Sequence, residues 1–329
     1  MKSQRLTYTA LVCSLIPTMS ANAEQVDALR NYLEQAFATS IVLTDSDVFT
    51  LGIHDFDPND WFNMQNEDIG SEESVQLRQQ IAATTLPYTF DLAGDNETGK
   101  HLLFTRLSAI RSEQDFEVPS VDIKDVNDEY VVGGFVAYRY QYKLNDHWTL
   151  TPGFGLHLQY FRNSHDYRSD LSEEFVKPQL DGVLFNTSAW ALSYEPHVKA
   201  KYHKTTEWGS WNFSSTFHYF YGYGWGEANH GVVGHPEGWY MANGADVYYN
   251  VSQLGESVQS VYASLRRIEI GGDTSKPLAT PHYYEASLGW LMTPPFHTEL
   301  IDNVGIGLNL NYGSALRGGS IVFFFNQVD

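Results

Sequence analysis

Residues 130–161 read YVVGGFVAYRYQYKLNDHWTLTPGFGLHLQYF and contain the clearest structural signal in the chain. Large apolar and aromatic side chains occupy alternate positions before and after Asn145-Asp146, a pair of residue types that favours turns. Successive side chains of a strand point to opposite faces, so each half has one apolar face and one face of small, polar and basic groups. The stretch therefore predicts two long strands joined by a turn, each with two different faces.

Residues 190–203 indicate what the two faces meet. One alternate row is apolar and aromatic, and the other carries ionisable side chains, namely Glu195, His197, Lys199, Lys201 and His203. A Lys or Arg that faces lipid at mid-depth in a bilayer costs about 2–4 kcal/mol. We therefore expect the ionisable row to face water and the apolar row to face lipid, as in the strands of a membrane-spanning barrel.

The same alternation recurs from Leu86 to the C-terminus and gives about eleven strands, while the β-rich segment Ser40–Ile53 would make a twelfth. Because bacterial barrels favour even numbers, the predicted fold is all-β, a transmembrane antiparallel β-barrel of about 12 strands with a short N-terminal helix. Residues 113–128 are expected to form an acidic loop, and residues 162–185 a long extracellular loop.

Three positions predict irregular strands. Pro152 and Pro196 lack the backbone N–H that a sheet ladder needs, so we expect strand ends or bulges there. Leu265-Arg266-Arg267 breaks the alternation of apolar and polar residues, which indicates a further bulge.

The N-terminus predicts export from the cytoplasm. Lys2 and Arg5 precede an apolar run over residues 7–19, and Ala21-Asn22-Ala23 is a small-x-small cleavage signal. The apolar run is too short for a transmembrane helix. The only cysteine, Cys13, lies in this segment, so we expect the mature chain to contain no thiol or disulfide.

The segment between the signal and the first clear strand is harder to place. Residues 24–39 carry apolar side chains on one helical stripe, which predicts a helix that either packs on the fold or plugs the pore. Residues 72–83 predict a second short helix. Asp55, Asp57 and Asn59 have the spacing of a calcium loop, but the glycine and final glutamate of that loop are absent, which favours a solvated turn. The predicted domains are a signal peptide (1–23), an N-terminal helix with an acidic segment forming a plug or first strand (24–85), and the outer-membrane barrel (86–329).

Composition excludes several function classes. The net charge of −20 argues against nucleic acid as a partner. Aromatic residues make up 15% of the chain, which suits a barrel with aromatic girdles at both membrane surfaces. After the signal there is no apolar run of about 18 residues, so we expect the chain to span by strands.

The inward rows of the strands define the predicted lumen. We expect it to be lined by Arg139, Lys143, His157, Glu195, His197, Lys199, Lys201, His203, His218 and Asn309. The basic members, with Arg266 and Arg267, could pair with acidic groups of a plugging N-terminal segment, form an anion-preferring constriction, or simply fill the lumen with ion pairs. The inward histidines could bind a transition metal, although hydrogen bonds to water and acidic groups are the favoured explanation.

No catalytic motif is present, so we expect neither an enzyme nor a cofactor or metal requirement. The sequence lacks Gly-x-Ser-x-Gly, His-Glu-x-x-His and a phosphate-binding glycine loop. The adjacent pairs His54-Asp55 and His165-Asp166 leave a hydrolase site at the barrel rim as an alternative, provided that all four residues converge.

The order of segments resembles the solitary outer-membrane autotransporter-like β-barrel family. The resemblance rests on the signal, on DALRNYLE (27–34), IVLTDSDV (41–48) and LPYTF (86–90), and on the barrel from about residue 100 onward. It implies a barrel like an autotransporter translocator without a sizeable passenger, in the outer membrane of a Gram-negative bacterium. A porin-like channel for small solutes is the alternative function, the rim hydrolase is a third class, and a soluble periplasmic β-protein is the fourth.

The resemblance also implies partners. These are outer-membrane lipid and the barrel-insertion machinery, which reads a final alternating aromatic strand such as Ile321, Phe323 and Phe325. Any substrate or passenger stays unknown.

Overall fold

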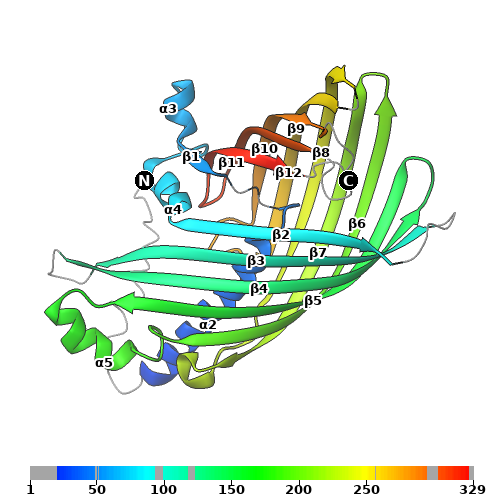
Figure 1. Ribbon diagram of the computed structural model, residues 1–329. Coiled ribbons are helices and arrows are strands. Elements are labelled where there is room, and N and C mark those ends of the chain that lie inside the picture. Colours follow the sequence, from blue (N-terminus) through cyan, green and yellow to red (C-terminus); the bar gives the residue numbers. More distant parts are fainter. Residues whose placement is uncertain are drawn as a thin grey trace.

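The computed structural model describes residues 21–325, except for residues 49, 51, 93–98, 118–122, 256 and 295–302. In this part of the chain, twelve strands form one antiparallel sheet in the order β1-β12-β11-β10-β9-β8-β7-β6-β5-β4-β3-β2 (Figure 1). The strands are β1 (His54–Phe56), β2 (Ile81–Asp91), β3 (Gly99–Glu117), β4 (Lys124–Lys143), β5 (Trp148–Asp166), β6 (Ser188–Thr206), β7 (Gly209–Gly226), β8 (Glu237–Leu254), β9 (Ser257–Gly272), β10 (His282–Met292), β11 (Val304–Tyr312) and β12 (Gly318–Phe325). The helices are α2 (Ala21–Leu43), α3 (Pro58–Phe62), α4 (Glu72–Gln79), η1 (Ser172–Val176), α5 (Lys177–Leu180) and η2 (Ala228–Gly231).

The two faces of the sheet differ as the alternation predicts. On β6, Trp190, Leu192 and Tyr194 are exposed on one face, whereas Ala191 and Glu195 are buried on the other. The exposed apolar row has no protein to cover it, which is the condition of strands that face lipid. The structure therefore confirms an all-β transmembrane barrel fold.

The sheet curves round so that its two edge strands approach each other, but backbone pairing does not close it (Figure 1). Among the described residues, β1 pairs only with β12, through three residues, and β2 pairs only with β3. The short strand β1 and the strand β2 are therefore the two edges of the sheet, and a closed barrel would join them.

Helix α2 extends further than the sequence predicts and replaces a predicted strand. Ser40–Ile53 was expected as a strand, but Ser40–Leu43 form the last turn of α2. The hydroxyl of Thr44 donates to the carbonyl oxygen of Ser40 at 2.7 Å, and Ile41 and Val42 are fully buried. Tertiary packing thus outweighs the β preference of these branched residues. No helix in the described part of the chain is long and apolar enough to cross a membrane.

Other predictions at strand boundaries were wrong. Residues 113–128 were expected to be a loop, but β3 continues to Glu117 and β4 begins at Lys124. The segment 72–83, expected to be helical, ends its helix at Gln79 and continues as β2. Tertiary pairing explains both, because these residues add their backbone to the β2–β3 and β3–β4 ladders.

The predicted bulges are absent. Pro152 and Pro196 lie within strands, and the ladder on one side of each skips a few residues without any change of register. At Leu265-Arg266-Arg267 the register is also continuous. Arg266 belongs to the inner row of β9, and Leu265 and Arg267 belong to the outer row, so the alternation is kept. The register shift lies instead between Asn250 and Ser252.

The two ends of the sheet differ in their connections. At one end, the tight turns 144–147 and 207–208 join β4 to β5 and β6 to β7. At the other end lie the longer segments 57–80, 167–187 and 227–236, which contain the remaining short helices. The predicted long loop at 162–185 is therefore confirmed as a loop, although it begins after Asp166.

Candidate functional site in the barrel interior

Helix α2 lies inside the curved sheet and contacts strands on different sides of it, including β4 and β8 (Figure 1). Its middle is packed against β4, β5 and β6. Phe37 is fully buried with Phe161 and Ala191, and the rings of Phe37 and Phe161 meet edge to face at 6.2 Å. The strands leave room for the helix because their inner rows carry small side chains, such as Ala189, at this level.

The start of α2 is held by the long loops. Leu29 packs with Leu180 and Phe185 of the segment that follows β5. The side-chain amide of Asn229 donates to the carbonyl oxygen of Val26 at 2.8 Å. The helix therefore begins at the end of the sheet that carries the long loops, and it runs inward from there.

The turn after α2 forms an ion pair with a strand of the sheet, between Asp45 and Arg106. The guanidinium of Arg106, on β3, lies 3.0 Å from Asp45, and the hydroxyl of Tyr240 donates to the same carboxylate at 2.9 Å. The side chains of Asp45 and Arg106 are only 9% and 4% exposed. A buried charge needs such a partner, because leaving it unpaired is strongly destabilising.

Two further cations of the wall meet the same turn. The ammonium of Lys199 lies 3.0 Å from Asp47, and Arg266 donates to the carbonyl oxygen of Ser46 at 2.7 Å. The last turn of α2 contains no basic residue. Because the C-terminal end of a helix carries partial negative charge, cations from β3, β6 and β9 complement it there.

A cluster of histidines surrounds a buried carboxylate beside this turn. Glu195 is completely buried, and its two carboxylate oxygens lie 2.8 Å from His157 and 2.8 Å from His218. His197 stacks on His218 with ring centroids 4.9 Å apart, and His218 stacks on Tyr240 at 4.4 Å. The register explains the stack, because His197, His218 and Tyr240 are cross-strand neighbours on β6, β7 and β8.

The structure brings only some of the predicted lumen residues together. His157, Glu195, His197 and His218 form the cluster just described, and Arg139 joins it by donating from Nε to Nε2 of His197 at 3.1 Å. Of the others, Lys199 reaches Asp47, His203 lies 2.5 Å from Asn212, and Asn309 donates to Ser287. Lys143 is exposed at the end of β4, and Lys201 is half-buried on the same face as Lys199.

Several residues of this interior were not among the predicted lumen residues. Arg106, Asp45 and Tyr240 form one of its buried polar contacts, and Asp47 forms a more exposed one with Lys199. The sequence carried two signals: Arg106, an inward candidate in the strand expected over residues 101–111, and the pair of aspartates within the otherwise apolar segment 41–48. The strand interpretation of segment 41–48 hid the second signal. Arg267, expected to face inward, lies on the outer row and pairs with Glu269.

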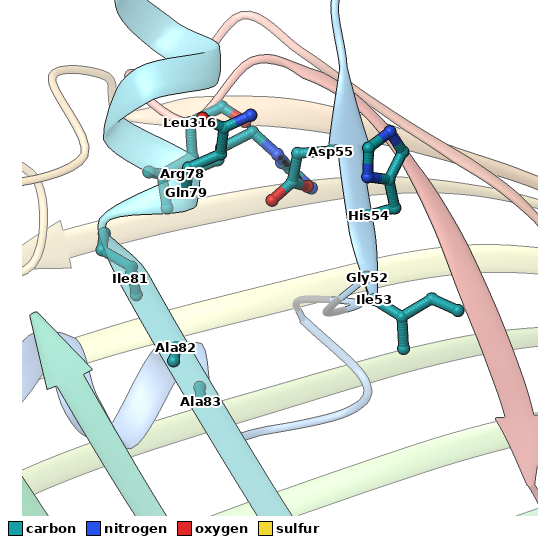
Figure 2. Close-up of a pocket in the computed structure, with 10 residues that line it drawn as sticks. All are labelled: Gly52, Ile53, His54, Asp55, Arg78, Gln79, Ile81, Ala82, Ala83 and Leu316. Carbon is teal, nitrogen blue, oxygen red and sulfur yellow. Dashed lines mark hydrogen bonds and ion pairs between the residues drawn. The ribbon is translucent and has the colours of Figure 1, made fainter.

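A pocket of about 410 Å³ lies at the seam between β1 and β2 (Figure 2). There, buried Arg78 of α4 lies 2.9 Å from Asp55 of β1, and it donates to the carbonyl oxygen of Leu316 and to the hydroxyl of Ser320 on β12. These side-chain bonds join α4, which precedes β2, to β1 and β12. They therefore bridge the seam between β1 and β2, which have no backbone ladder between them in the described part of the chain.

The two predicted His–Asp pairs have separate surroundings. His54 and Asp55 project from opposite sides of β1 (Figure 2), and Asp55 bonds to Arg78. His165 stacks on Phe185 at 3.7 Å and lies 3.5 Å from Asp125. The spacing of a calcium loop also has a local explanation, because Asp57 caps α3 by accepting from the N–H of Asn59.

Comparison with protein families gives one match that covers most of the chain. The family model described as "Solitary outer membrane autotransporter beta-barrel domain" matches residues 34–327. The matched range includes the last ten residues of α2 as well as all twelve strands. Comparison with individual curated proteins gives no match.

Proposed function

Because this chain belongs to the solitary outer-membrane autotransporter β-barrel family, we propose that it is a translocator-like outer-membrane barrel whose pore is closed by its own N-terminal segment. The observation that carries the proposal is the course of α2 through the interior, with Phe37, Ile41 and Val42 buried against the strands. A helix packed in this way occupies the space that a solute would need.

The orientation follows from the connections. Outer-membrane barrels have short periplasmic turns and longer extracellular loops. The tight turns 144–147 and 207–208 would therefore lie in the periplasm, and the loops 167–187 and 227–236 outside the cell. Since α2 begins beside the long loops, cleavage of the signal after Ala23 would leave the new N-terminus at the extracellular mouth.

The proposed role needs no catalysis. Charged groups of the interior pair with one another, as in Arg106 with Asp45 and Glu195 with the histidines. The partners would be outer-membrane lipid around the exposed apolar rows and the machinery that inserts barrels. Export would use the N-terminal signal, which lies almost entirely outside the described residues.

The alternative is a porin-like channel for small solutes. It is favoured by the cationic side chains Lys199 and Arg266, which would attract anions if the helix left the pore. The unclosed seam between β1 and β2 does not by itself provide a channel along the barrel axis, because it lies in the wall.

Conductance in planar bilayers separates the two functions. The purified, full-length mature protein is expected to give no large steady conductance, only brief openings. A large, steady pore at low voltage in most inserted molecules would reject the plugged barrel and support the channel. Heat-modifiable migration of the unboiled protein on a gel would show that the inserted material is folded.

A further inference from the structure

Three buried side chains on the inner wall have the arrangement of a metal-binding set. Glu195 and His197 are two residues apart on β6, so both point inward, and His218 is the cross-strand neighbour of His197 on β7. One ligand atom from each of the three lies within 4.8 Å of the others. All three are buried, with exposures of 0%, 7% and 2%.

The distances suit direct coordination. In a tetrahedral zinc site the metal–ligand distances are about 2.0–2.1 Å, so that neighbouring ligand atoms lie about 3.3 Å apart. Here the separation from a carboxylate oxygen of Glu195 is 2.8 Å to Nδ1 of His218 and 3.5 Å to Nδ1 of His197. Shifts of well under 1 Å would bring these two separations to the tetrahedral value.

The charges also leave a cation to be supplied. Within the described residues, the close charged or chargeable partners of the Glu195 carboxylate are all imidazoles, with no Lys or Arg paired to it. A fully buried carboxylate requires a compensating positive charge.

We propose that Glu195, His197 and His218 bind a divalent transition-metal ion of the zinc and copper class in the barrel interior. Imidazole nitrogens with a carboxylate suit these ions, whereas calcium and magnesium require a larger set of oxygen ligands. The three protein ligands leave a further coordination position for water. The site is independent of the closed pore, although Tyr240, which stacks on His218, bonds to Asp45 of the turn after α2.

Arg139 competes with the metal for His197. It donates to Nε2 of His197, and a neutral imidazole that accepts there carries its proton on Nδ1. Nδ1 can coordinate only after the proton moves to Nε2 and Arg139 turns away. The positive charge of Arg139 opposes a dication as well. Removing Arg139 should therefore strengthen metal binding, which a non-specific histidine surface would not predict.

Zinc titration of the EDTA-treated, purified mature protein in detergent tests the site. We expect one Zn²⁺ per barrel by calorimetry and elemental analysis. His218→Gln and Glu195→Gln should each weaken binding by at least about 10- to 100-fold, the loss that even an altered supporting group causes. Arg139→Met should tighten it. The matched control is His203→Gln, on the same face of β6 but bonded to Asn212, which should change nothing.

Two outcomes of the zinc titration would overturn the proposal. One is a folded wild-type protein that binds no stoichiometric zinc or binds it no better than His218→Gln; the other is equal weakening by His203→Gln, which would mean adventitious binding. If a variant does not fold, Co²⁺ added to the wild-type protein gives an independent answer. An intense visible absorption band of tetrahedral Co²⁺ with nitrogen and oxygen ligands is expected, and its absence would reject the site.

Discussion

The ion pair between Asp45 and Arg106 gives the sharpest test of the proposal that the N-terminal segment closes the pore. In Asp45→Asn the charge and one acceptor are lost, so Arg106 stays buried without its anion and the hydroxyl of Tyr240 competes for the remaining oxygen. One guanidinium nitrogen of Arg106, Nη2, already has no hydrogen-bond partner. When the N-terminal segment leaves the interior, water can reach Arg106, so the substitution should destabilise the plugged state more than the open one.

The magnitude follows from burial. Removing one member of a buried ion pair costs about 3–5 kcal/mol. Since 1.36 kcal/mol corresponds to a factor of ten, the ratio of open to closed time should rise roughly 100- to 5,000-fold. The assay is single-channel recording of the mature protein in planar bilayers, with heat-modifiable gel migration as the test of barrel folding.

The same turn offers a matched control. Asp47 also pairs with a basic residue, but the side chains of Asp47 and Lys199 are 36% and 35% exposed. Ion pairs accessible to water contribute about 0.2–1 kcal/mol, so Asp47→Asn should raise the ratio less than about 6-fold. If Asp45→Asn opened the pore no more often than Asp47→Asn, the buried pair would not be what holds the segment in place.

Three further predictions concern the helix, the lipid-facing surface and the orientation. Phe37→Ala, in the fully buried cluster with Phe161, should lower the hydrogen-exchange protection of α2 amides by about 3–5 kcal/mol, and unchanged protection would contradict the packing described for α2. Leu156→Arg, in the middle of β5, should destabilise the barrel in lipid by about 2–4 kcal/mol, but Tyr142→Arg, near the end of β4, by only about 0–1 kcal/mol; equal costs in refolding titrations would argue against a depth-dependent lipid contact. An epitope tag placed before Glu24 should bind antibody on intact cells, whereas a tag in the turn 207–208 should require permeabilised cells, and the opposite result would invert the barrel.

Features that depend on neighbouring residues were predicted correctly, whereas features that depend on distant contacts were not. The face assignment on β6 was correct because it depends only on the alternation of neighbouring residues: Leu192 is exposed and Glu195 is buried. The predictions that failed concerned segments whose conformation depends on distant contacts. Ile41 and Val42 favour a strand by residue type, but in the structure they belong to α2, in the same buried cluster as Phe220 and Ile268.

The bulge predictions failed for a related reason. The alternation at Leu265-Arg266-Arg267 appeared broken because two successive basic residues place one charge on each face of the strand. In the structure Arg266 keeps its inward place, since Ser46 and the carboxylates of Asp246 and Glu285 surround its guanidinium. Those partners come from other parts of the chain, so sequence alternation could not reveal them.

The amino-acid sequence by itself determined the barrel class and the alternation of apolar rows with rows that carry polar and ionisable side chains, because this alternation depends only on consecutive residues. The tertiary structure decided which residues occupy the interior. Asp45 meets Arg106 across 61 positions and Tyr240 across 195, and the cluster around Glu195 depends on the register of three strands. Such contacts are set by how the sheet curves and pairs, and no local pattern specifies them.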